Sequence, residues 1–301
     1  MSCDKSQLYM ELIAAFMPYS VRKPIFTLFK GYFDESGNND IFTLSCVFAK
    51  VSNWGFFIND WLDVIERKNR DLRQQGRKEL SRFHAVDCSS YVEEFSGWDE
   101  SERRPFLAEL LRVFERPANA TNSLAYSIRL KNLVEDLPET APDPRGFAYA
   151  LLLKVVMEEL GKSMDEVNDG DISPIKIPLI HERCLYDAVL LRSFNDLIGD
   201  PSFKYATIFP SLVPMGWEDC PFLQPADFIA YENFKEDERY ITGRQRRYPL
   251  RKLLSGDAFG GKAGCFDEDG MDRLKRGITE ELKQQLLLEA NIRAKKPAPE
   301  N

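Results

Sequence analysis

Hydrophobic and polar positions along the chain predict strands near its start, followed by a mixture of helices and strands. Residues 25–33 form an apolar run, residues 37–40 are turn formers, and residues 41–49 are apolar again, which predicts a hairpin. From Trp54 to Ile65, apolar side chains recur at helical spacing, and we expect the charged stretch 68–78 that follows to be exposed. Alternation at 124–130 and again at 175–182 predicts further strands.

Other apolar periods predict the remaining elements. Helical patterns occur at 6–17, 100–116, 146–160, 186–198 and 271–290, whereas 205–209 has the pattern of a strand. The run 83–88 is interpreted as a strand end or a loop, and 260–264 as a glycine-rich loop. We expect Pro225 to be the first residue of a helix, which would place Asp227 in its first turn. The pattern favours an α/β fold, a mixed β-sheet flanked by helices on both faces.

Bulk properties narrow the class of protein. A length of 301 residues allows one large domain or two small ones, and the net charge of -8 argues against a protein that coats nucleic acid over its whole surface. With no apolar run long enough to span a bilayer and no signal-peptide pattern, we expect a soluble, cytoplasmic protein without a membrane partner. The 6 cysteines lack a C-x-x-C pair and only 2 histidines occur, which indicates reduced thiols and argues against a Cys/His zinc site.

Three acidic residues are the candidate ligands for a divalent metal, because such ions prefer oxygen donors from separate rigid elements. Asp34 ends the first apolar run, Glu182 ends the strand-like run 175–182, and Asp227 begins a predicted helix. If the strands that lead to Asp34 and Glu182 are parallel neighbours, the two carboxylates emerge side by side at their carboxyl ends. Glu35 and Asp187 are weaker candidates for a fourth ligand.

Each acid also has a structural explanation that the sequence leaves open. Asp34 lies in a run of turn formers and would serve equally well in a hairpin turn. The helix dipole favours an acid at the position of Asp227, although the following residues on that face are apolar. Glu182 would form a salt bridge with Arg183 or another cation.

The histidines and one basic segment complete the candidate site. His84 and Asp87 are three residues apart in an apolar stretch, where His84 would serve as a structural hydrogen-bonding group, protonate a leaving oxygen or contact phosphate. His181 should point away from Glu182 because neighbouring strand residues face opposite sides. A basic segment follows the Asp227 helix and resembles a phosphate-backbone contact, or a solvated loop that pairs with acids: Arg239, Arg244, Arg246, Arg247, Arg251 and Lys252. The charged run 66–82 is interpreted as solvated.

Two common catalytic motifs are missing from the sequence. It contains no G-x-x-x-x-G-K-[ST] loop, which argues against a P-loop nucleotide hydrolase. It contains no G-x-S-x-G elbow either, and Ser36 has no evident histidine base.

As a set, the motifs resemble the prokaryotic domain-of-unknown-function 3800 family. The resemblance rests on YFDESG at 32–37 with the strand that follows, FHAVD at 83–87 and LQPADFIAY at 223–231, and it covers about residues 28–236. It implies a ribonuclease H-like fold and a metal-dependent nuclease of the kind often carried by phages and mobile elements. It also implies that Asp34 and Asp227 are metal ligands, that Glu182 is a further one, and that His84 belongs to the site in a role that the resemblance does not assign.

We therefore expect a hydrolase that cleaves nucleic-acid phosphodiester bonds with two Mg²⁺ or Mn²⁺ ions. Asp34, Glu182 and Asp227 would hold the ions, and Glu35 and His84 would assist catalysis. The expected organisation is a domain at 1–236 and a basic segment with a terminal helix at 237–301, with DNA or RNA as partner and a homodimer left open. The alternatives are a non-catalytic nucleic-acid or protein interaction module on the same fold, and a metal phosphohydrolase that acts on nucleotides.

Overall fold

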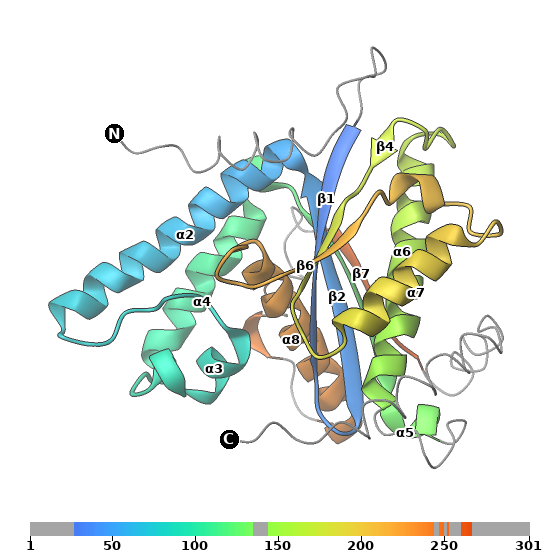
Figure 1. Ribbon diagram of the computed structural model, residues 1–301. Helices are drawn as coiled ribbons and strands as arrows, with labels where there is room; N and C mark the ends of the chain where they lie inside the picture. The colour runs from blue at the N-terminus through green and yellow to red at the C-terminus, as the bar shows by residue number, and fades with distance from the viewer. Residues whose placement is uncertain (1–26, 135–143, 244–246, 250–251, 253–259, 267–301) are drawn as a thin grey trace.

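The computed structural model describes residues 27–134, 144–243, 247–249, 252 and 260–266, and Figure 1 shows a mixed β-sheet with helices packed on both faces. The 7 described strands have the order β6-β5-β1-β2-β3-β7, and β4 pairs with the start of β1. Strands β1, β2 and β3 are antiparallel neighbours, whereas β5 runs parallel to β1, β6 parallel to β5, and β7 parallel to β3. The predicted α/β architecture is confirmed at this level.

The elements alternate along the chain after the opening hairpin. The strands are β1 (Thr27–Gly37), β2 (Ile41–Lys50), β3 (Asn122–Arg129), β4 (Ile175–Lys176), β5 (Leu179–Glu182), β6 (Leu212–Met215) and β7 (Gly260–Phe266). The helices are α2 (Val51–Gln74), α3 (Ala85–Ser90), α4 (Glu100–Glu115), α5 (Leu130–Val134), α6 (Pro144–Val167), α7 (Asp187–Gly199) and α8 (Leu223–Thr242). Short 3₁₀ turns lie at Glu93–Phe95, Pro117–Asn119 and Ala206–Ile208.

The sheet separates two hydrophobic cores, because successive side chains of a strand point to opposite faces. Phe33 and Leu179 belong to the core beneath α6 and α7. Tyr32 and Ile180 belong to the core beneath α2, α4 and α8. This alternation decides which face each polar residue at the ends of β1 and β5 occupies.

The turn of the opening hairpin begins after Gly37, later than the turn-forming residues of the motif suggest. The Asn38 side-chain oxygen accepts hydrogen bonds from the backbone N–H groups of Asp40 and Ile41, at 2.8 and 2.9 Å, and thereby closes the turn. Asp34 lies within β1, opposite Ser45 of β2, and its side chain is buried. The interpretation of Asp34 as a turn residue is therefore wrong.

Three local predictions differ from the structure. The predicted strand 205–209 is a 3₁₀ turn, and its buried residues Tyr205, Ile208 and Phe209 have the i, i+3, i+4 spacing of a helical turn. The strand instead lies at 212–215, at one edge of the described sheet, where Pro214 is tolerated. The predicted strand end or loop at 83–88 forms most of helix α3, and the glycine-rich stretch at 260–264 forms most of β7.

Helix α8 begins two residues before the predicted start. Leu223 is its first residue, so Pro225 is not the first helical residue, and Asp227 is not in the first turn. The helix continues to Thr242 and crosses the expected domain boundary at 236/237. The predicted helices at 6–17 and 271–290 lie outside the described residues. Among the helices in the described ranges, none is long and apolar enough to cross a membrane.

Candidate metal centre

The parallel pairing of β1 with β5 brings the first two acids together. Phe33 is opposite His181 in the register, so Asp34 and Glu182, the next residues of each strand, are adjacent. Both follow residues that face the core beneath α6 and α7, so both carboxylates face α8 instead. The parallel arrangement that the sequence could only suppose is confirmed.

Helix α8, which covers this face of the sheet, supplies the third acid. The helix packs over β1 and β2, and the Asp227 side chain is buried. Its Oδ2 atom accepts a hydrogen bond from the backbone N–H of Ala85 at 2.7 Å. Because Asp227 lies beyond the first turn, this bond from the start of α3, rather than the dipole of its own helix, holds the carboxylate.

The three acids interact electrostatically, and two of them, Asp34 and Asp227, are buried. Burial raises the pKa of Asp34 well above its ordinary value, and the charges of Asp227, Glu35 and Glu182 raise it further. One opposing contact is the backbone N–H of Glu35, which donates to Asp34 Oδ1 at 2.8 Å. Asp34 therefore lies at the centre of the acidic cluster, where a negative charge needs compensation.

At Asp227, groups that raise the pKa are partly offset by groups that lower it. Burial raises its pKa to about 6, and Glu182 contributes in the same direction. His84, the hydrogen bond from Ala85 and Arg82 oppose this rise. A cation bound at this carboxylate would act in the same direction as these opposing groups and favour its charged form.

Glu35 lies on the opposite face of the sheet from the other three acids. Its Oε2 atom accepts a hydrogen bond from the hydroxyl of Tyr149 on α6, at 3.1 Å. Burial raises the pKa of Glu35 to about 7, the bond from Tyr149 opposes this rise, and the charges of Glu182 and Asp187 add to it. Glu35 thus acts on the cluster through its charge from the α6 side of β1.

The segment before α3 contributes an arginine and a histidine near the acids. The Arg82 guanidinium lies 3.4 Å from Glu182 Oε1 and stacks on the Trp217 ring, so Glu182 has a cation partner other than Arg183. His84 Nδ1 lies 2.6 Å from Asp87 Oδ2, which leaves Nε2 as the ring nitrogen available to a ligand. The charged run 66–82 is predicted from the sequence to be solvated, but Arg82 at its end contacts Glu182 and Trp217 instead.

Gln224 is a structural residue of the centre that the sequence analysis did not single out, although it lies within the LQPAD motif. Its buried Oε1 atom accepts hydrogen bonds from the backbone N–H of Phe83 at 2.9 Å and from Trp61 Nε1 at 3.2 Å. These bonds attach the segment with Arg82 and His84 to the start of α8. The sequence signal for this role was weak: Gln224 directly follows the apolar residues Phe222 and Leu223.

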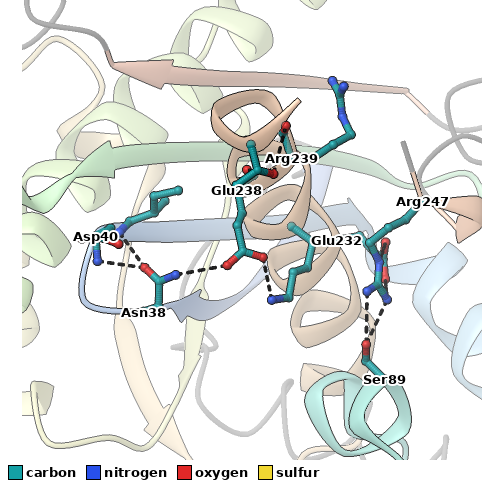
Figure 2. Close-up of polar contacts among 10 residues, drawn as sticks. Asn38, Asp40, Ser89, Glu232, Glu238, Arg239 and Arg247 are labelled. Atoms are coloured by element: carbon teal, nitrogen blue, oxygen red, sulfur yellow. Dashed lines mark hydrogen bonds and ion pairs between the residues drawn. The ribbon is translucent and has the colours of Figure 1, made fainter. Parts of the chain in front are cut away.

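The predicted basic contacts are engaged within the protein where the structure describes them. Figure 2 shows Arg247 between Glu232 of α8 and Ser89 of α3, with a 3.0 Å ion pair to the buried Glu232. Arg239 pairs with Glu236 on its own helix at 2.6 Å, and Lys252 pairs with Glu115 at 2.8 Å. The remaining predicted contacts lie outside the described residues: Arg244, Arg246 and Arg251.

Comparisons with known proteins add no relative. No protein-family model, no curated protein and no solved structure matches the chain.

Proposed function

We propose that the chain is a metal-dependent nuclease that hydrolyses phosphodiester bonds of DNA or RNA with two Mg²⁺ or Mn²⁺ ions. The observation that carries this proposal is the meeting of Asp34, Glu182 and Asp227, contributed by β1, β5 and α8, in one cluster where Asp34 and Asp227 are buried and Glu182 is partly exposed. We also propose that the sheet is ribonuclease H-like and that the chain belongs to the domain-of-unknown-function 3800 family. The resemblance, which names these three acids as metal ligands, supports both proposals.

The donor set fits hard divalent cations. All three side chains offer carboxylate oxygens, the kind of ligand that Mg²⁺ and Mn²⁺ prefer, and their mutual repulsion would be relieved by positive charge. Within the described ranges, the acids do not form a group with all ligand atoms inside 4.8 Å of one another. A wider spacing is expected for a two-ion site, because paired ions in phosphoryl-transfer sites lie about 3.5–4 Å apart and their ligands surround both ions.

When bound, the ions would supply a deprotonated water and neutralise the charge that develops on the phosphate. Asp34 is adjacent to Glu182 in the β1–β5 register, and the charges of Asp227 and Glu182 both raise its pKa, so it would share a bound ion with either. Asp87 orients the His84 ring, so His84 would hold or deliver a proton at Nε2 on the leaving-oxygen side. Arg82, which already pairs with Glu182, would contact a nonbridging phosphate oxygen.

The direct test compares Asp34→Asn with Asp40→Asn, a matched change at an exposed acid in the turn of the same hairpin. Both proteins and the wild type are assayed on single- and double-stranded DNA and RNA in Mg²⁺, Mn²⁺ or EDTA. We expect Asp34→Asn to lose at least about 100-fold in cleavage rate, the scale of removing one electrostatic stabiliser, while Asp40→Asn keeps wild-type turnover. Circular dichroism and thermal unfolding establish that both variants fold.

Wild-type turnover in the Asp34→Asn protein would remove the assignment. Absence of cleavage, together with no rise in melting temperature on adding Mg²⁺ or Mn²⁺, would favour the non-catalytic interaction module, because a ligand that binds only the folded state must stabilise it. Efficient competition by mononucleotides for the cleavage reaction would instead favour a nucleotide phosphohydrolase.

A further inference from the structure

The connection from β5 to α7 gathers three potential metal ligands of a different kind. One ring nitrogen of His181, the Cys184 Sγ atom and one carboxylate oxygen of Asp187 all lie within 4.8 Å of one another. The three residues are spaced at i, i+3 and i+6, and the chain reverses between them, since β5 ends at Glu182 and α7 begins at Asp187. The end of β5, the loop and the first residue of α7 therefore supply a nitrogen, a sulfur and an oxygen ligand.

This cluster lies on the opposite face of the sheet from the three acids. His181 pairs with Phe33, whose side chain packs beneath α6 and α7, and the following residue, Glu182, points to the other face. The His181 side chain is only 1% exposed, whereas the Asp187 side chain is 27% exposed. A ligand can thus reach the cluster from solvent at Asp187 without entering the acidic site.

The hydrogen bonds of His181 leave one ring nitrogen unused. Nδ1 donates to the backbone carbonyl of Glu182 at 2.9 Å, while Nε2 is buried and has no hydrogen-bond partner among the described groups. Metal-binding histidines commonly donate one ring N–H to a backbone carbonyl and bind with the other nitrogen. A buried nitrogen without a partner is costly and calls for an explanation, which a bound cation would supply.

The other two ligands are positioned by their own backbone. The Cys184 N–H donates to Asp187 Oδ1 at 2.9 Å, which fixes this carboxylate, and Asp187 Oδ1 lies 3.8 Å from His181 Nδ1. Cys184 would bind a metal as the thiolate, so formation of the metal–sulfur bond releases the thiol proton to solvent.

We propose that His181, Cys184 and Asp187 bind a Zn²⁺-class transition-metal ion, with a fourth position left to water. The mixed nitrogen, sulfur and oxygen set suits Zn²⁺ and disfavours Mg²⁺, which would remain the preference of the acidic site. Three protein ligands leave the coordination open, as in zinc sites that exchange or activate a water. The scarcity of histidine is no obstacle, because this site uses only one.

Co²⁺ is the probe, because thiolate ligation produces a near-ultraviolet charge-transfer absorption that oxygen ligands do not. The metal-stripped full-length chain is titrated with Co²⁺ and compared with Cys184→Ser and with Cys265→Ser, a matched change at an exposed cysteine. We expect the band in the wild type and in Cys265→Ser, its loss in Cys184→Ser, and at least about tenfold weaker binding in Asp187→Asn. No band in the wild type, or a band that survives Cys184→Ser, overturns the proposal.

A second measurement uses no variant, so it tests the site even if Cys184→Ser fails to fold. Maleimide labelling of the native chain, quantified for each cysteine by peptide mass spectrometry, should be slowed at Cys184 at least about tenfold by Zn²⁺, with Cys265 unaffected. Equal labelling with and without Zn²⁺ contradicts the site. The Co²⁺ band should persist in Asp34→Asn, so failure of the nuclease proposal and failure of this one are distinguishable.

Discussion

Neutralising Asp227 should stabilise the metal-free protein at alkaline pH. The folded chain raises the pKa of this carboxyl from 3.8 to about 6, chiefly through burial. Because the folded-state value lies above the unfolded one, the favourable contribution of the protonated group is complete below 3.8 and is lost as the pH rises through about 6. Above that range the wild type therefore carries an unfavourable buried charge.

The size of the effect follows from the two values. Each pH unit between them is worth about 1.4 kcal/mol, which gives about 3 kcal/mol near pH 8. Asparagine has the same shape as aspartate and an oxygen that accepts the hydrogen bond from the Ala85 N–H. A neutral acceptor forms a weaker bond than a carboxylate, which lowers the stability of the variant by about 1 kcal/mol. We expect Asp227→Asn to be more stable than the wild type by about 2 kcal/mol near pH 8, and slightly less stable near pH 4.

Urea unfolding in EDTA at about pH 8 and about pH 4 measures both differences, with Asp40→Asn as the control for an exposed acid. Adding Mg²⁺ near pH 8 should raise the stability of the wild type and have a much smaller effect on Asp227→Asn, because the variant lacks one ligand. A variant that is destabilised equally at both pH values would refute the reasoning, since the hydrogen bond and not the charge would then dominate.

Two further variants test the electrostatics of neighbouring groups. Glu35→Gln should be more stable than the wild type near pH 8 and similar to it near pH 4, because burial raises the pKa of Glu35 from 4.5 to about 7. Urea unfolding without divalent ions measures this difference. An equal loss of unfolding free energy at both pH values would contradict the prediction. Arg247→Met should lower the free energy of unfolding by about 3 kcal/mol, because the Glu232 side chain is 2% exposed and would lose its cation. Adding Glu232→Gln to this variant should restore most of that stability. An equal loss of stability in the single and double variants would contradict the prediction. Unchanged nucleic-acid affinity of the double variant, measured by fluorescence anisotropy, would show that Arg247 is not a phosphate contact.

Local patterns predicted most helices and strands of the described chain. The apolar stripe from Trp54 predicted α2, the alternation at 124–130 predicted β3, and the turn formers after Gly37 predicted the opening hairpin. Periodicity failed where the burial pattern was ambiguous or weak. Residues 205–209 are apolar at both strand-like and helical spacing, while β6 and β7 have exposed positions and carry proline or glycine, so their pairing depends on neighbours that the local sequence does not identify.

The sequence identified the acids as candidate metal ligands, because Asp34 and Glu182 each end an apolar strand-like run and Asp227 lies in a helix with an apolar side. Their meeting depends on contacts between distant segments: β5 must pair with β1 in parallel, and Ala85 must reach Asp227 across the start of α8. Placing His181 on the opposite face from Glu182 required only strand alternation. Bringing its ring to Cys184 and Asp187 required the folded loop, because the positions of donor atoms depend on backbone angles that residue types alone do not determine.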